Sequence, residues 1–208
     1  MEAGWDNERG SEALSQVTKA HSRFSIRNED YLFVLWTFID FPIQWMKDFG
    51  WRKFTSHEEK AWFNFWVRIG DIMGIGSIPE TKAEYDALIE DYESREMVFS
   101  VHSRNVSEAT LRIMEGWLHP SLRRIVGPLA ACLSRPRFLG AAGYETPHWF
   151  VTKTVRLLLR VRAYMKRLVS FDRFPDLLSK QAYRTYPQGL PSLEELEPEY
   201  YSPWEKGR

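Results

Sequence analysis

The longest apolar run of the chain, YLFVLWTFIDFPIQWM, lies at residues 31–46. Asn28 or Asp30 can cap a helix that contains this run, and Pro42 is expected to kink or end it near Phe41. The run is so apolar that it predicts a helix buried on all sides. At about 16 residues, with an Asp and a Pro inside, it falls short of the ~20 apolar residues that a membrane-spanning helix needs.

A second apolar stripe precedes this run. Ser11 is predicted to cap a helix that extends to about Phe24, whose inner face carries Leu14, Val17, His21 and Phe24. Capping-box patterns then predict two more helix starts. One is Ser56 with Glu59, or Thr55 with Glu58, before residues 57–75; the other is Thr81 with Glu84, before residues 82–99.

Helical spacing continues in the second half of the chain, and further helices are predicted at about 106–118, 121–134 and 148–170. No run alternates with the period of a strand. The pattern therefore predicts an all-α fold. With 208 residues the chain fits one domain. We expect a disordered N-terminus at 1–10, a helical domain at 11–182 and a Pro-rich, extended C-terminal arm at 183–208.

Composition and short sequence motifs exclude several classes of protein and of site. Cys132 is the sole cysteine of the sequence, which excludes a disulfide framework and a Cys-based zinc site. The first residues are polar and acidic, so no signal peptide is recognised and an intracellular location is expected. The sequence contains no P-loop, GxGxxG or nucleophile-elbow motif, and no two histidines have the i, i+4 spacing of a helical metal site. The catalytic residues stay unknown at this stage.

Charge is distributed unevenly, although Lys+Arg and Asp+Glu both number 28. Residues 1–100 hold 11 basic and 18 acidic side chains, and residues 101–208 hold 17 and 10. One interpretation is that the two halves pack against each other. The other is a basic surface that faces an anionic membrane or ligand.

The segment 151–171 is both basic and amphipathic. Its basic positions are Lys153, Arg156, Arg160 and Arg167, and its apolar positions are Val151, Val155, Leu158, Met165 and Val169. Such a helix can pack its apolar side into a core, or it can make a peripheral membrane contact near residues 153–167. A nucleic-acid partner is not expected, because no recognition motif is present and the acidic half would oppose binding.

His21 is the candidate site residue. A lone histidine on an apolar helical face is usually a hydrogen-bonded core residue. A haem site, however, needs an axial imidazole beside an apolar, aromatic pocket, with basic groups for the propionates. Lys19, Arg23 and Arg27 flank His21, and 13 of the 36 residues from 31 to 66 are aromatic.

Several landmarks together resemble the catalytic domain of the fungal MpaB-type oxygenases and the bacterial rubber oxygenases (latex-clearing proteins). They are His21 before the capped apolar helix, Pro42 followed by Trp45, GWR at 50–52, FW..IGD.MGI..IP at 65–79, YE at 92–93 and TYPQG…LEEL at 185–196. The resemblance covers about residues 15–200.

This resemblance implies an all-α, globin-like protein that binds haem b and cleaves carbon–carbon double bonds of isoprenoid chains with dioxygen. The expected partners are therefore an apolar small molecule and dioxygen. A histidine at the matching position is the proximal iron ligand of the rubber oxygenases, so the role falls to His21. Arg23 and Arg27 become propionate or structural candidates. Fungal relatives imply association with the endoplasmic reticulum membrane.

The chain also departs from the family pattern. The family's distal haem residues lie upstream of the proximal histidine, and the 20 residues before His21 contain no counterpart. The chain is thus expected to be an N-terminally truncated member. The alternative to an oxygenase is a non-catalytic helical remnant that acts as a binding or interaction module, including at a membrane surface.

Overall fold

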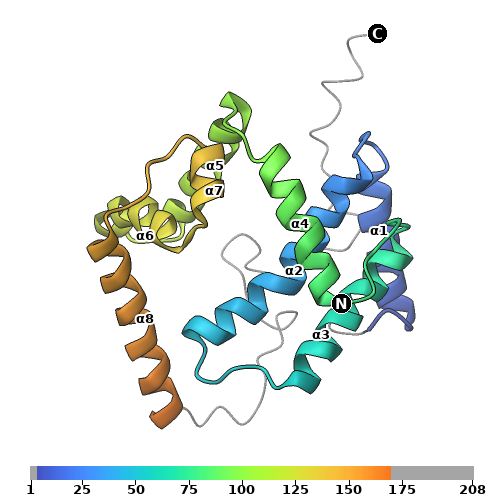
Figure 1. Cartoon of the computed structure of the whole chain (residues 1–208), viewed down its shortest axis with the longest axis horizontal. Coiled ribbons are helices and arrows are strands. Elements are labelled where there is room, and N and C mark those ends of the chain that lie inside the picture. Colours follow the sequence, from blue (N-terminus) through green and yellow to red (C-terminus); the bar gives the residue numbers. More distant parts are fainter. Residues whose placement is uncertain (1–3, 170–208) are drawn as a thin grey trace.

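The computed structural model describes residues 4–169, and all of the regular structure in that part of the chain is helical (Figure 1). The expected all-α class is therefore confirmed. The predicted C-terminal arm at 183–208 lies outside the described residues. In chain order the helices are α1 (Glu8–His21), α2 (Asn28–Phe49), α3 (Ser56–Ile72), α4 (Lys82–Glu96), α5 (Val101–Gly116), the 3-10 helix η1 (Pro120–Ile125), α6 (Val126–Leu133), α7 (Pro136–Ala141) and α8 (Trp149–Val169).

α2 occupies the middle of the molecule and packs against α3, α4 and α8. One side of α2 contributes Leu32, Leu35, Trp36, Ile39 and Ile43 to the hydrophobic core, which Phe63, Ile75, Tyr85 and Ile89 complete. The opposite side is open: Val34, Phe38 and Phe41 are each about half exposed or more, at 50%, 48% and 63%. The expectation of a helix buried on all sides is therefore wrong.

Pro42 does not end α2, contrary to the sequence-based expectation, and the helix continues to Phe49. A proline inside a helix removes the N–H that would bond to the carbonyl four residues earlier, here that of Phe38. The indole Nε1–H of Trp62 donates to that carbonyl at 3.0 Å. A side chain from α3 thus replaces the missing backbone donor, and the helix passes through the proline.

Helix starts follow local capping chemistry. Thr55 and Glu58 form the full capping box of α3, which decides between the two patterns in the sequence, and Thr81 caps α4. α1 begins earlier than expected because Asn7, not Ser11, is its cap: the Asn7 side chain accepts a hydrogen bond from the backbone N–H of Gly10 at 2.9 Å.

Other bounds also differ from the predicted ones. The helix after Thr81 ends at Glu96, and the next begins at Val101 because the Ser100 side chain caps it. The single helix predicted at 121–134 is instead η1 followed by α6. The helix predicted at 148–170 corresponds to α8, which begins at Trp149 and extends to the last described residue, Val169.

Opposite charges join the acidic and basic parts of the sequence. Arg135 and Arg137 pair with Glu93 and Glu90 of α4, and Arg156 of α8 pairs with an aspartate at the end of α2. These contacts agree with the interpretation that the two halves pack against each other.

The start of α2 is tied to the end of α4 through Asp30. Its carboxylate accepts hydrogen bonds from Arg27 at 2.8 and 3.0 Å and from the Tyr92 hydroxyl at 2.7 Å. The Arg27 hydrogen bond lowers the pKa of Asp30, against the opposing effect of burial. Burial, with the hydrogen bond to Asp30, raises the pKa of Tyr92 to about 12.

We predict that Asp30→Asn lowers the free energy of unfolding by about 1 kcal/mol near neutral pH, because two charge-assisted hydrogen bonds weaken. A carboxylate with a lowered folded-state pKa stabilises the fold above its unfolded pKa and loses that effect as the pH falls through the folded value. The gap between Asp30→Asn and the unmodified chain should therefore shrink below about pH 4 in urea unfolding curves. Asp71→Asn, on exposed α3 surface, is the control. A gap that stays constant with pH would contradict the assignment.

Candidate functional site

A large cavity lies between α2, α4, α6 and α7, with a volume of about 1140 Å³. This is at the upper end of the ~300–1,000 Å³ typical of small-molecule sites. Its aromatic lining comes mainly from α2, and α8 contributes Arg156. The aromatic lining residues are Phe33, Trp36, Phe41, Trp45, Phe49, Trp117 and Phe138.

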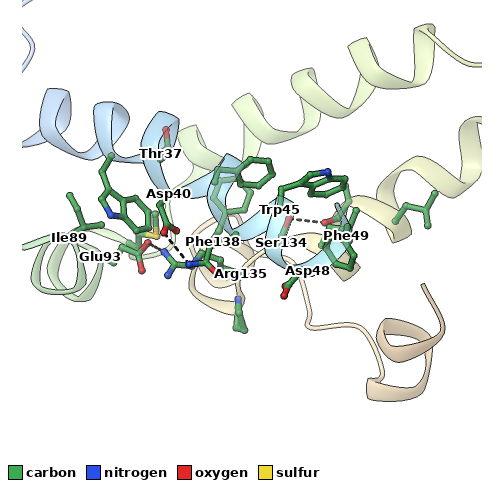
Figure 2. Close-up of a pocket in the computed structure, with 18 of the residues that line it drawn as sticks. Thr37, Asp40, Trp45, Asp48, Phe49, Ile89, Glu93, Ser134, Arg135 and Phe138 are labelled. Carbon is green, nitrogen blue, oxygen red and sulfur yellow. Dashed lines mark hydrogen bonds and ion pairs between the residues drawn. The ribbon is translucent and has the colours of Figure 1, made fainter. Parts of the chain in front are cut away.

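The cavity is chemically two-ended. In Figure 2, Asp40, Glu93 and Arg135 lie together toward one end, whereas Trp45 and Phe49 lie toward the other. Trp45 and Phe49 make an edge-to-face contact with ring centroids 5.0 Å apart. Asp48, which pairs with Arg156 of α8, also lies beside Phe49, so this second end carries an ion pair as well as aromatic rings. The arrangement suits an elongated, mainly apolar molecule that carries a polar group.

Glu93 is the most deeply buried charge at the polar end, at 4% exposure. The burial of Glu93 follows from the helical spacing of α4, which places Tyr85, Ile89 and Glu93 on one face. Arg135 donates a short hydrogen bond to Glu93, and Arg137 lies 3.5 Å from its other oxygen. A buried carboxylate needs such partners, since an unpaired one would be strongly destabilising.

Trp36 connects this ion pair with a second polar cluster. The Arg135 guanidinium lies over the Trp36 ring at 5.1 Å, within cation–π range. On its other side the Trp36 indole N–H donates to Asp86 at 2.7 Å. One indole therefore contacts a cation through its face and an anion through its edge.

Lys82 bridges the two aspartates of the second cluster. Its ammonium donates to Asp40 at 2.8 Å and to Asp86 at 2.7 Å. Burial alone would lower the pKa of Lys82, but the hydrogen bonds to Asp40 and Asp86 outweigh it and the net pKa is raised. Lys82 therefore stays charged near neutral pH and neutralises part of the acidic end of the cavity.

His21 is the last residue of α1 and is partly buried beside Tyr31, with ring centroids 5.8 Å apart. Its Nδ1 lies 2.7 Å from the carbonyl oxygen of Val17. Since a carbonyl can only accept, Nδ1 carries a proton, and in the neutral form of the ring the lone pair is then on Nε2. This is the tautomer that a metal-ligating imidazole with a backbone-anchored N–H adopts, so the donor chemistry of His21 fits an axial haem ligand.

The cavity and His21 are separate features. None of the residues that line the 1140 Å³ cavity is a histidine, and a smaller cavity beside α1, with Leu14, Thr18 and Lys19 in its wall, does not include His21 either. No group of three or more His, Cys, Asp or Glu side chains within residues 4–169 is arranged to hold a metal ion. A haem ligand role for His21 stays a prediction.

The two flanking arginines differ in their surroundings. Arg23 is exposed. Arg27 makes paired hydrogen bonds to Asp30 and to Glu96, at 3.1–3.2 Å for the latter, and these raise its pKa further. A haem propionate would have to compete with the carboxylates of Asp30 and Glu96 for the Arg27 guanidinium. The structural role of Arg27, which is to pair with these two carboxylates, needs no rearrangement. Both assignments to haem propionates stay predictions.

Sequence reasoning missed the polar end of the cavity, although two signals were present. Asp40 interrupts the most apolar helix of the chain, and Glu93 falls on the buried stripe of α4. A carboxylate at a core position requires a buried partner. For Glu93 this partner is Arg135, which lies 42 residues away in the chain. No local sequence pattern indicates which distant side chain it is.

We predict that Arg135→Gln lowers the free energy of unfolding by about 2 kcal/mol, because it leaves Glu93 buried with one distant cationic partner. Adding Glu93→Gln should recover part of that loss, with a coupling energy of about 1 kcal/mol between the two sites. Chemical denaturation of the two single variants and the double variant measures this. Strictly additive effects would mean that the two side chains do not stabilise each other.

Comparison with known proteins shows which proteins this chain is similar to. Residues 7–170 match the family model described as "ER-bound oxygenase mpaB/B'/Rubber oxygenase, catalytic domain". Among curated proteins, the ER-bound oxygenase mpaB' of Penicillium brevicompactum is 26% identical over 160 residues, which cover 71% of this chain and 38% of that protein. The chain thus spans well under half the length of this curated relative. No solved structure matches the chain. Because the family model matches most of the sequence, from α1 to the end of α8, the chain belongs to the family of mpaB and rubber oxygenase catalytic domains.

Proposed function

We propose that this chain is a haem-dependent oxygenase domain that acts on an apolar, isoprenoid-type small molecule with dioxygen. Membership of an oxygenase family supports the reaction class, and the observation that carries the substrate class is the 1140 Å³ aromatic-lined cavity. Burial of an apolar chain against these rings would provide the binding energy, at roughly 25 cal/mol per Å² of apolar surface. Asp40, Glu93 and Arg135 would bind the polar end of the molecule.

Haem is the cofactor of this proposal, with His21 as its protein ligand. The bound iron would supply dioxygen binding. The support from this chain is the hydrogen bond from Nδ1 of His21 to Val17, which leaves Nε2 for the metal. Because His21 does not line the large cavity, the alternative of a haem-free binding module that retains the cavity is kept as an outcome of the tests.

The membrane is part of the same proposal. The relative mpaB' is described as ER-bound. No helix within residues 4–169 is both long enough and apolar enough to cross a membrane. We place the site of action at the surface of the endoplasmic reticulum membrane, where apolar isoprenoid chains concentrate.

The cavity is tested with farnesol as an apolar chain probe, by titration calorimetry. We predict that Trp45→Ala weakens binding at least about tenfold, since a tryptophan contributes a large contact area to a ligand. Trp51→Ala is the matched control, because Trp51 is 52% exposed and does not line the cavity. Equal affinities of the two variants, with both folded by circular dichroism, would refute the cavity as the binding site.

The cofactor is tested by adding haemin, removing the excess and recording the absorption spectrum. We predict a stoichiometric Soret band for the unmodified chain and for His57→Ala, whose histidine is exposed on α3, and its loss in His21→Ala. Loss of the band in His21→Ala alone supports the ligand assignment. Absence of the band from the unmodified chain, with farnesol binding intact, would establish the haem-free binding module instead.

A further inference from the structure

The outer face of α8 is apolar and exposed. Helix α8 lies at the edge of the molecule, packed against α6 and α2 (Figure 1). Its packed side carries the buried Ala163 and the partly buried Thr152, Arg156 and Leu159, which recur at helical spacing. The opposite side is solvent-exposed, at 47–65%, and carries Phe150, Leu157, Leu158, Val161, Met165 and Leu168.

Charge on α8 is of one sign. The helix Trp149–Val169 contains basic residues and no Asp or Glu. At 100° per residue, Lys153, Arg160 and Arg167 follow one edge of the exposed apolar face, and Arg162 follows the other. Lys153 lies 4.8 Å from the centroid of the Trp149 ring, at the start of the same face. Long basic side chains at such edges can extend their charges while their alkyl stems remain on apolar surface.

We propose that this outer face of α8 docks on an anionic phospholipid surface. An apolar band between two basic edges is the arrangement with which an interfacial helix buries its apolar side chains at the level of the lipid headgroups and pairs its cations with anionic lipids. The exposed apolar band favours lipid over nucleic acid, whose phosphates would leave that band in water. If another protein covered this face, the basic side chains at its two edges would find no carboxylate partner on α8 itself, which contains no Asp or Glu.

The docked helix would also position the cavity. Arg156 projects from the packed side of α8 to the cavity wall, where it lies over the Phe49 ring at 5.0 Å and pairs with Asp48. One helix therefore has the lipid surface on its outer side and the cavity on its inner side. The docking inference does not depend on the proposed oxygenase chemistry and can fail or hold separately from it.

The test is flotation of the full chain with vesicles of phosphatidylcholine alone and with added phosphatidylserine. We expect binding to the phosphatidylserine vesicles and at least about tenfold weaker partitioning of the variant Arg160→Glu/Arg167→Glu, because each basic side chain near an anionic surface contributes about fivefold. Lys60→Glu/Arg68→Glu on α3 makes the same change in net charge and should bind as the unmodified chain does. The pair Leu157→Gln/Leu168→Gln should weaken binding as well, with Val98→Gln/Val106→Gln as its exposed control.

Three results would overturn the proposal. The first is equal binding to both kinds of vesicle, or an equal effect of the α8 and α3 charge changes. The second is absence of vesicle binding together with a dimer in sedimentation that Leu157→Gln/Leu168→Gln dissociates, which would assign the face to a second copy of the chain. The third is salt-sensitive binding to duplex DNA or RNA without lipid binding. Circular dichroism of each variant separates these outcomes from misfolding.

Discussion

The indole of Trp36 is the contact on which the arrangement of α2, α4 and the Arg135 segment depends. Its ring belongs to the hydrophobic core, its N–H donates to Asp86 and its face lies under Arg135, which in turn neutralises Glu93. An aromatic ring can meet these requirements together because its edge is positive and its face is negative. The core and the cavity, which lie on neighbouring sides of α2, therefore share one wall.

Buried carboxylates constrain the rest of the cavity. Asp40 and Glu93 are both less than one-tenth exposed, and each has cationic partners from another part of the chain. Once these charges are buried, their partners cannot leave without a large cost. The polar end of the cavity is for this reason expected to be rigid, while the aromatic end can adapt to a bound chain by side-chain rotation.

His21 and the cavity raise the main functional question about the chain. The imidazole has the anchored tautomer that a metal ligand requires, yet it lies outside the cavity that suits an apolar molecule. Family membership supports oxygenase chemistry for the family's catalytic domain, whose model matches residues 7–170 of this chain. The cavity, the imidazole and the outer face of α8 can each be examined separately, because different side chains form them.

Local chemistry in the sequence was sufficient for the helical class, for the cap at Thr81, for two alternative caps at Thr55 or Ser56 and for the family landmarks, because helix periodicity and capping involve residues within a few positions of one another. Tertiary structure decided the rest. The Trp62 hydrogen bond that carries α2 through Pro42, the pairing of Glu93 with Arg135 and the exposure of α8 depend on residues far apart in the chain or on neighbouring elements. No local pattern encodes which distant side chain satisfies a buried carbonyl or carboxylate, or which side of an amphipathic helix is left uncovered.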